Sequence, residues 1–523
     1  MFTLQPQSSI PLVTQIVDGL RRLIDDGSLR AGTKVPSIRQ FAHAHEVSVF
    51  TVVEAYDRLV ALGYLVSRPH SGFFVRKRAA VENRESGPPG VPGGGYSFDS
   101  AWYLRKIFEN RHLSMKAGCG WLPHEWLFED GVRRSLRALA ADSIDLGGYG
   151  DPKGFPPLRE FIRDAMAEQE IAIVPEQVLL TQGSSQALDL AARRLVRAGD
   201  AVLVDDPGYA NLLFSLRFAG AKLVGVPRTP HGYDLPTLEK LIIEHRPKIF
   251  FTQPRLQSPT GSTAQLAHLH RVLQLAEKHD FLVVENDIYV DLDPEPRPSL
   301  ASLDQLSRVL YVGSYSKTIS PNLRVGYLVA HPDLIEDLAQ LKMISGLTSS
   351  EFSERLVYGA LTEGRWRKHL KALRDRLAEA HQRVAGRLAR LGFEIFSEPK
   401  AGMFLWARHP QLPDAGMLSN QAAGSDIMLG PGHLFTAAMQ STAWIRFNVA
   451  FCGEERLFDF LAERVRAGGR DSGDSGDSGD SGDSGDSGDS GDSGDSGDSG
   501  DSGDSGDSGD SGDSGDRPEG ELL

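Results

Sequence analysis

Short apolar runs that alternate with helical stretches constrain the fold of most of this chain. Five of these runs stand at residues 178–181, 201–205, 248–252, 281–285 and 309–312. Strands that are apolar along their whole length and are separated by helices are typical of a parallel sheet with both faces covered. Residues 351–391 are rich in the helix formers Leu, Ala, Arg and Glu, and the stretch that follows mixes strands and helices. We therefore predict an α/β domain at 111–467, with a largely parallel sheet and a small C-terminal α/β subdomain.

The first 78 residues predict a separate, smaller domain. Apolar residues recur at helical spacing in 12–24, and Ser37 and Ser48 stand as candidate N-caps before two further amphipathic stretches. Two β-rich runs, 64–67 and 73–75, then flank a turn. Three helices followed by a hairpin is the order of a winged helix-turn-helix. We therefore predict an α+β DNA-binding domain at 1–78.

Two segments of biased composition bound the α/β domain. Residues 79–110 include two Pro- and Gly-rich stretches and predict a flexible linker. Residues 468–523 contain fifteen consecutive Asp-Ser-Gly repeats, whose like charges repel one another and predict a disordered tail. The formal net charge is −14, and sixteen acidic residues lie in this repeat tract. Residues 1–78 hold ten Lys or Arg against six Asp or Glu, a basic balance that suits binding to phosphates.

The sequence also argues against several classes of protein. Cys119 and Cys452 are far apart and have no Cys or His at ligand spacing, which disfavours a disulfide framework or a structural zinc site. No apolar run approaches the roughly 20 residues that cross a bilayer, and residues 1–13 lack the basic-then-apolar order of a signal peptide. We expect a cytoplasmic protein without a membrane partner.

The predicted helix-turn-helix identifies candidate contacts to double-stranded DNA. The second helix of such a motif meets base edges with its first turn, and short polar side chains at helix N-termini hold phosphates. The candidates are Ser48 and Thr51 at the start of that helix, Arg39 on the preceding helix, and Arg68 and His70 at the hairpin tip. The alternative is that the serines only cap helices and the arginines form a solvated face.

Two motifs in the α/β domain indicate a site for a phosphorylated ligand. Gly183, Ser184 and Ser185 follow a predicted strand and open a helix, where backbone N–H groups can bind a phosphate. The run VGSYSK places Lys317 at the end of another strand, and Arg324 follows seven residues later. A lysine at a strand end lies where ligands bind in α/β sheets, and its amine forms a Schiff base with an aldehyde once its pKa is lowered. The alternatives are an ordinary Gly-Ser turn and a solvated surface lysine.

Residues 10–76 resemble the GntR family of winged-helix regulators, through PSIRQFA at 36–42, VSVFTV at 47–52 and GYL at 63–65. The resemblance implies binding to a double-stranded DNA operator through Arg39, Ser48, Thr51 and the hairpin. One position departs from the family, because Val49 stands where the family often has Arg. This departure predicts a missing phosphate or base contact, and hence a weaker affinity or a different operator.

Residues 115–465 resemble aminotransferases of class I and II, fold-type I proteins that bind pyridoxal 5'-phosphate. The resemblance implies Lys317 as the lysine of the internal aldimine; Gly183, Ser184, Ser185, Ser314 and Arg324 around the cofactor phosphate; Tyr209 stacked on the pyridine ring; Tyr289 on the phenol oxygen; Arg446 on a substrate α-carboxylate; and Tyr149 reaching the phosphate from the partner subunit. The role of Tyr149 predicts a domain-swapped homodimer.

Two positions depart from the aminotransferase pattern. Ser258, in SPTG at 258–261, replaces an Asn whose amide would contact the phenol oxygen of the cofactor. Asn286, three residues before Tyr289, replaces the Asp that faces the pyridine nitrogen. An aspartate keeps that nitrogen protonated and makes the ring an electron sink, which a neutral amide cannot do. A shift of register would bring Asp287 to the nitrogen instead, but adjacent strand residues face opposite ways, so we expect Asn286 there.

A GntR-like winged helix, a linker and an aminotransferase-like domain in this order are typical of the MocR-type regulators, and the chain is identified as a member of that family. We expect a pyridoxal-phosphate-dependent transcription regulator that senses an amino acid, an amine or the vitamer through the internal aldimine. Lys317, Asn286 and Tyr289 are the predicted catalytic positions, and Asn286 predicts weakened catalysis with cofactor binding retained. The alternative is an active aminotransferase with an appended DNA-binding domain, which Lys317 and Arg446 favour. A DNA-binding protein with an inert dimerisation domain is disfavoured because so many cofactor-contacting residue types remain.

Overall fold

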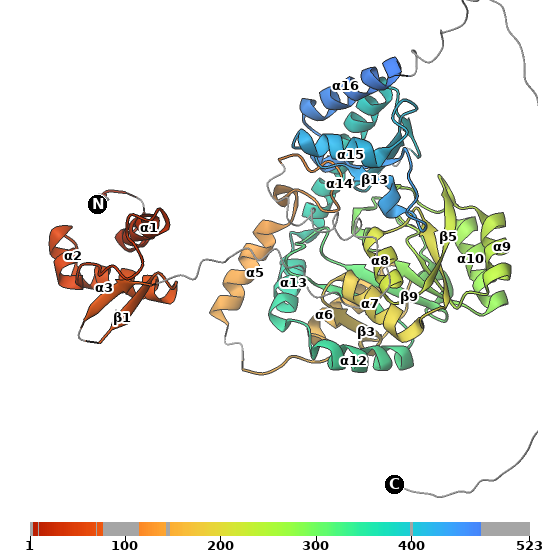
Figure 1. Ribbon diagram of the computed structural model, residues 1–523. Coiled ribbons are helices and arrows are strands. Elements are labelled where there is room, and N and C mark those ends of the chain that lie inside the picture. The colour runs from red at the N-terminus through yellow and green to blue at the C-terminus, as the bar shows by residue number, and fades with distance from the viewer. Residues whose placement is uncertain are drawn as a thin grey trace, which may run out of the picture. The chain divides into compact units, whose positions relative to one another are not determined.

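The computed structural model describes residues 4–8, 10–69, 71–76, 114–142, 147–397 and 401–471, with the backbone alone for 469–471. The chain divides into two units, Met1–Ser97 and Phe98–Leu523 (Figure 1). The predicted linker at 79–110 and most of the predicted tail lie outside the described residues. Each unit is considered separately.

The first unit is a winged helix-turn-helix, as predicted. It consists of α1 (Leu12–Asp25), α2 (Ile38–Ala44), α3 (Val49–Ala61), β1 (Leu65–Arg68) and β2 (Gly72–Val75). The two strands form an antiparallel hairpin. Ser37 and Ser48 cap α2 and α3, because each side chain accepts a hydrogen bond from a backbone N–H in the first turn of its helix. The core lies between the helices and includes Ile16 and Tyr56, both fully buried.

The second unit is built on an eight-stranded sheet with the order β3-β10-β9-β8-β7-β4-β5-β6. Its strands are β3 (Val178–Thr181), β4 (Ala201–Asp206), β5 (Lys222–Thr229), β6 (Gly232–Tyr233), β7 (Ile249–Thr252), β8 (Leu282–Asn286), β9 (Val309–Ser314) and β10 (Gly326–Val329). The five central neighbours β9, β8, β7, β4 and β5 are parallel, whereas β10 runs antiparallel to both β3 and β9. The parallel strands therefore end at one edge of the sheet, where side chains that follow different strands meet.

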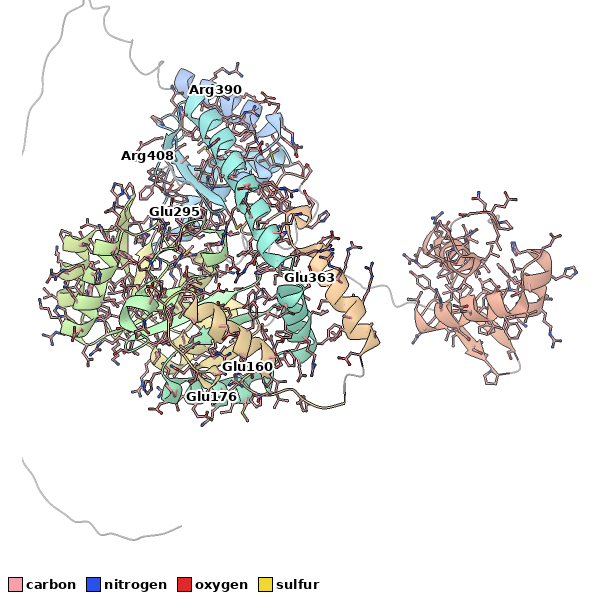
Figure 2. All side chains as sticks on the ribbon, turned by 180° about the vertical axis from the view of Figure 1, so that it is seen from behind. Glu160, Glu176, Glu295, Glu363, Arg390 and Arg408 are labelled. Atoms are coloured by element: carbon pink, nitrogen blue, oxygen red, sulfur yellow. The ribbon has the colours of Figure 1, made fainter. Side chains whose placement is uncertain are left out.

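Helices cover both faces of this sheet, which explains why its strands are apolar throughout. They are α5 (Glu129–Ala141), α6 (Pro156–Ala167), α7 (Ser184–Leu195), α8 (Ala210–Phe218), α9 (Leu235–His245), α10 (Leu266–His279), α11 (Leu300–Asp304), α12 (Pro332–Gly346) and α13 (Glu351–Thr362). Adjacent strand residues join opposite cores: Val283 packs with residues of α6, α9 and α10, and Val284 packs with residues of α7, α8 and α12. Figure 2 shows side chains filling these layers, and Glu363, at the end of α13, pairs with Arg134 of α5 at 2.6 Å.

The C-terminal subdomain has its own sheet and core. It contains α14 (Trp366–Arg390), β11 (Glu394–Ile395), β12 (Phe404–Arg408), α15 (Ala415–Gly424), β13 (Gly430–Pro431), β14 (Ile445–Asn448) and α16 (Glu455–Asp471). The four strands form an antiparallel sheet with the order β11-β12-β14-β13. The helix α16 extends four residues beyond the predicted domain edge at 467. The segment 115–122 also packs into this core, so an early part of the unit lies against its last part.

Short 3-10 helices complete the second unit. They span His124–Trp126, Pro175–Gln177, Val290–Leu292, Gly432–Phe435 and Val449–Phe451. Cys119 and Cys452 are free, buried thiols. Within the ranges described, none of the helices has the length and apolar character that a bilayer span requires.

Candidate cofactor and DNA sites

The N-terminus of α7 forms an anion-binding corner. Gly183 precedes this helix with a φ of +75°, and no side chain caps the helix. A β-carbon on Gly183 would lie 2.4 Å from Nη2 of Arg324, so this position requires a glycine. Nη2 of Arg324 donates to the carbonyl oxygen of Gln182 at 3.0 Å. Backbone N–H groups and a guanidinium therefore converge where a phosphate would be bound.

Ser184 and Ser314 border the same corner, whereas Ser185 is exposed at the next helical position. Gly326 on β10 pairs with Ser314 on β9. A β-carbon on Gly326 would lie 2.7 Å from the backbone nitrogen of Ser184. The amide N–H of Ser316 donates to Oγ of Ser314 at 3.2 Å, which orients that hydroxyl. The structure thus brings together the predicted phosphate residues, which come from three strands.

Lys317 lies between the large sheet and the segment that packs on the C-terminal subdomain. Its Nζ donates to the carbonyl oxygen of Gly120 at 2.6 Å. Burial lowers the pKa of Lys317 to about 8, and the nearby cations Arg446 and Arg324 contribute to this lowering. A larger fraction of this amine is therefore neutral near physiological pH than in an exposed lysine, and a neutral amine is the nucleophilic form.

Arg446, on β14, is buried and held in a fixed orientation. Its Nη2 donates to the carbonyl oxygen of Gly118 at 2.7 Å, and its Nη1 donates to Oγ of Ser258 at 3.2 Å. The rings of Phe404 and Phe435 lie 4.6 and 4.5 Å from its guanidinium carbon. Its Nε has no hydrogen-bond partner within the described part of the chain. This guanidinium can accept a carboxylate, because it is oriented and not neutralised by an acidic side chain in the contacts above.

A small pocket at the sheet edge contains Asn286 and Tyr209. The lining side chains come from β4, β7, β8, α7 and α8. Asn286 ends β8 and is 2% exposed, yet neither its amide nitrogen nor its amide oxygen has a hydrogen-bond partner among the residues described. Burying an amide without partners is unfavourable, and such groups in folded proteins commonly mark a missing ligand. The unpaired amide of Asn286 therefore indicates that a polar ligand atom belongs in this pocket.

Asp287 does not line this pocket. Its Oδ1 forms an ion pair with Nε of Arg255 at 3.1 Å, and its Oδ2 accepts a hydrogen bond from the hydroxyl of Tyr311 at 3.2 Å. Burial raises the pKa of Asp287, and the charge of Arg255 opposes this effect. Asp287 thus belongs to a separate buried charge cluster, which is the alternation that the strand geometry requires.

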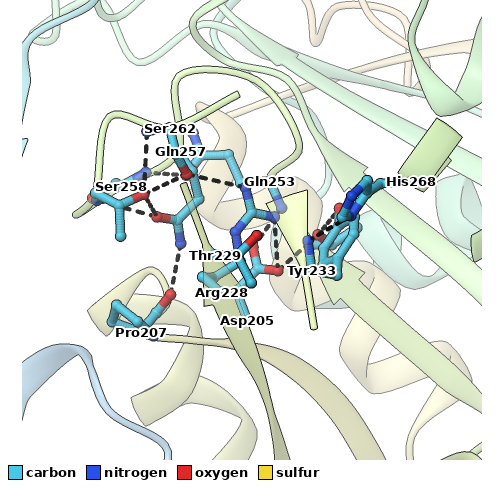
Figure 3. Close-up of polar contacts among 12 residues, drawn as sticks. Asp205, Pro207, Arg228, Thr229, Tyr233, Gln253, Gln257, Ser258, Ser262 and His268 are labelled. Carbon is cyan, nitrogen blue, oxygen red and sulfur yellow. Dashed lines mark hydrogen bonds and ion pairs between the residues drawn. The ribbon is translucent and has the colours of Figure 1, made fainter. Parts of the chain in front are cut away.

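Asp205 is a pocket residue that the sequence analysis did not single out. Its Oδ1 accepts from the hydroxyl of Thr252 at 2.8 Å, and its Oδ2 accepts from the backbone N–H of Gln253 at 2.8 Å (Figure 3). The guanidinium of Arg228 lies 3.6 Å from Asp205 and stacks 4.6 Å from the ring of Tyr233. Burial raises the pKa of Asp205, and Arg228 opposes the rise. This network supports the pocket wall from three neighbouring strands, which no local sequence motif could reveal.

Two further predicted residues lie in different environments. Tyr289 is buried, its ring packs edge-on against Phe404, and burial raises its pKa. Tyr149 is 83% exposed and does not line the pocket of its own chain. Near it, the buried Lys342 donates to the carbonyl oxygens of Pro152 and Leu180, both at 2.8 Å. Lys342 therefore ties the segment that follows Tyr149 to the end of β3.

The predicted DNA contacts lie on the surface of the first unit. Arg39 is exposed on α2, and Arg68 is exposed in the hairpin, where its guanidinium lies 4.6 Å from the ring of Phe74. Oγ of Ser48 accepts from the backbone N–H of Thr51 at 3.0 Å and hydrogen-bonds to its hydroxyl at 2.8 Å. Ser48 therefore has the structural role of a cap, whether or not it also contacts DNA. His70 lies outside the described residues.

Comparisons with known proteins match both units. Residues 12–75 match the family model "Bacterial regulatory proteins, gntR family", and residues 124–464 match "Aminotransferase class I and II". The chain is 31% identical over 448 residues to the probable rhizopine catabolism regulatory protein MocR of Rhizobium meliloti, covering 82% of this chain and 88% of that protein. It is 33% identical over 362 residues to the 2-aminoadipate transaminase of Thermus thermophilus, covering 67% of this chain and 88% of that protein.

The fold of the second unit is also similar to solved structures. The α-aminoadipate aminotransferase LysN from Thermus thermophilus, complexed with N-(5'-phosphopyridoxyl)-L-leucine, superposes with a TM-score of 0.62 at 29% identity, covering 71% of this chain and 96% of that one. The similarity to the rhizobial regulator, unlike that to the transaminases, extends over most of both units. The chain therefore belongs to the MocR-type regulators of the GntR family, in which a DNA-binding winged helix precedes a domain of the class I and II aminotransferase fold.

Proposed function

We propose that this regulator binds pyridoxal 5'-phosphate at Lys317 and responds to an amino acid or an amine that binds beside it. The observation that carries the proposal is the buried, unpaired amide of Asn286 in the pocket that Tyr209 also lines. The solved relative that was complexed with a phosphopyridoxyl amino acid supports the same class of ligand.

The residues present fit the phosphate and the ring of this cofactor. The N-terminus of α7, Arg324 and Ser314 would hold the phosphate, and Tyr209 would stack on the pyridine ring. Nζ of Lys317 would bind the aldehyde carbon, which its lowered pKa favours. When bound, the cofactor supplies an electron sink for carbanion chemistry.

Asn286 would bind the pyridine nitrogen without a charge. Its amide nitrogen can donate a hydrogen bond to that atom, which satisfies one of the two unpaired polar atoms. An amide does not hold a proton on the pyridine nitrogen, so the sink is weaker than with an aspartate. The site therefore retains binding and loses catalytic strength, which suits a sensor better than an efficient transaminase.

Arg446 would orient the carboxylate of an amino-acid effector. Its fixed guanidinium lies close enough to Lys317 to lower the pKa of that amine. An effector bound through both groups would exclude water from between the segment 115–122 and the large sheet. Effectors without a carboxylate, such as simple amines, would lack this contact and bind more weakly.

The proposed regulator is a domain-swapped homodimer. The 83% exposed ring of Tyr149 is available to a second copy of the chain, and Lys342 anchors the segment beside it. The winged helices would then contact two half-sites of an operator through Arg39, Ser48, Thr51, Arg68 and His70. Effector binding would change operator affinity by binding one arrangement of the dimer more tightly than the other.

A spectrum and a DNA-binding measurement test the proposal together. The purified chain is expected to show the visible absorption band of a lysine-bound cofactor, and Lys317→Ala is expected to remove it. Lys371→Ala is the matched control, because Lys371 is 80% exposed and pairs with Asp375 on the surface of α14. Anisotropy of labelled duplex DNA should then respond to amino acids in the control and not in Lys317→Ala. A band that persists in Lys317→Ala would refute the assignment of the lysine.

A further inference from the structure

The start of α3 exposes two large apolar side chains that the core of the domain does not use. Phe50 is 87% exposed and Val49 is 47% exposed, at the first two positions of the helix. The inward face of α3 consists of Val52, Ala55, Tyr56 and Leu59, which are all fully buried. Phe50 therefore faces away from the core and contributes little to folding. Most of a phenyl ring left in solvent indicates a contact outside this domain.

The position of these side chains identifies the surface that they meet. In a helix-turn-helix the first turn of the second helix enters the major groove and touches base edges. Ser48 caps this helix and precedes both side chains, so Val49 and Phe50 lie in that turn. They stand, moreover, at the place where a guanidinium is often found in this family, and a guanidinium would read guanine.

The charge along the rest of α3 argues for base edges and against the phosphate backbone. A shallow hollow along the outer face of the helix is lined by Phe50, Val53, Glu54, Asp57, Arg58 and Ala61. Glu54 and Arg58 neutralise each other in an ion pair at 2.6 Å. Asp57, on the same face, would repel phosphates. The N-terminal end of this face therefore offers apolar contact and no net positive charge.

We propose that Phe50, supported by Val49, reads the 5-methyl groups of thymine in the major groove of the operator. The thymine methyl is the one apolar group that base pairs present in that groove, and phenylalanine is among the side chains that contact it. Specificity is then carried by apolar contact, and affinity is carried by the arginines that meet phosphates. This inference rests on the proposed operator binding by the winged helix.

The test removes the methyl group from the DNA and leaves the protein intact. The full-length protein selects duplexes from a library of random sequence, and one selected duplex is resynthesised with deoxyuridine in place of each thymine in turn. Deoxyuridine keeps every hydrogen-bonding group of thymine and lacks its methyl. At the contacted thymines the Kd is expected to rise about fourfold for each methyl removed, the value for one buried methyl-sized group.

Variants at the two ends of α3 provide the protein side of the test. Phe50→Ala is expected to bind the thymine and deoxyuridine duplexes equally, and circular dichroism should be unchanged because the side chain is exposed. Leu62→Ala is the matched control: Leu62 is 52% exposed at the opposite end of α3, so this variant should keep the full preference for thymine. The slope of log Kd against log salt should stay unchanged in Phe50→Ala, because no phosphate contact is lost, and should become shallower in Arg39→Ala.

The outcomes separate this inference from the proposal beneath it. If no duplex is enriched from the library, operator binding itself is refuted, and the inference with it. If duplexes are enriched but deoxyuridine changes the Kd at none of their thymines, the thymine inference is refuted and DNA binding stands. A preference for thymine that persists unchanged in Phe50→Ala would also refute the role of this side chain.

Discussion

Replacing Gly183 by alanine tests the phosphate corner more directly than any change to a charged residue. A β-carbon there would lie 2.4 Å from Nη2 of Arg324, so the guanidinium must leave its place beside the N-terminus of α7. The end of an arginine side chain can move at low cost, so the protein should still fold. The movement, however, removes Arg324 from the position at which it would hold a phosphate.

The magnitude follows from two separable terms. Alanine at a φ of +75° enters the left-handed region, which costs about 1–2 kcal/mol of unfolding free energy. Gly199→Ala is the matched control, because Gly199 has a φ of +87° and no described atom lies within 4 Å of its β-carbon position. Loss of a charged hydrogen bond removes about 1.5–3 kcal/mol. This loss corresponds to a Kd for pyridoxal phosphate that is higher by about 10- to 100-fold, and it applies to Gly183→Ala alone.

The assay combines urea unfolding of the cofactor-free protein with titration of pyridoxal phosphate, followed by absorbance. Both variants are expected to lose similar stability, and Gly183→Ala alone is expected to lose cofactor affinity. If Gly183→Ala and Gly199→Ala bind the cofactor equally well, the corner formed by Arg324 and α7 is not the phosphate site.

Two further predictions concern Asn286 and Lys317. Asn286→Asp is expected to raise keto-acid release from amino acids by about tenfold or more, because each pKa unit gained at the pyridine nitrogen corresponds to about 1.4 kcal/mol; Asp287→Asn, a change in the separate charge cluster, should lower stability without raising turnover. Rapid turnover by the unchanged protein would contradict the sensor proposal. The rate at which the cofactor-free protein attaches pyridoxal phosphate should rise with pH and level off above about 8, because the amine must be neutral and its pKa is lowered to about 8. A rate that still rises tenfold per unit well above this pH would indicate an ordinary, exposed lysine amine.

Much of the site was predictable because its signals are local. Gly183 and Lys317 each lie at the junction of an apolar strand and the next segment, and that junction is visible in the sequence itself. The choice of Asn286 over Asp287 also followed from local geometry, since neighbouring residues on a strand face opposite sides. The structure agrees, with Asn286 in the pocket and Asp287 paired with Arg255.

The contacts that sequence reasoning missed join residues that are far apart along the chain. Gly118 and Gly120 supply carbonyl oxygens to Arg446 and Lys317 across 328 and 197 residues. Asp205, Thr252 and Arg228 meet because β4 lies between β7 and β5, an order that no single strand encodes. The position of Tyr149 shows a different limit, because an exposed residue that serves a partner subunit has no contact in its own chain that would identify it.

By itself, then, the amino-acid sequence determined the local elements: which runs form strands, which serines cap helices, and which lysine, arginine and glycine end up near strand ends. These depend on periodicity and backbone preference over a few residues. The tertiary structure alone decided which carbonyls hold Lys317 and Arg446, how Asp205 is stabilised in the pocket wall, and that the amide of Asn286 is buried without a partner. The physical reason is that burial and hydrogen-bond satisfaction are properties of packed, distant segments, and they exist only once the sheet order has brought those segments together.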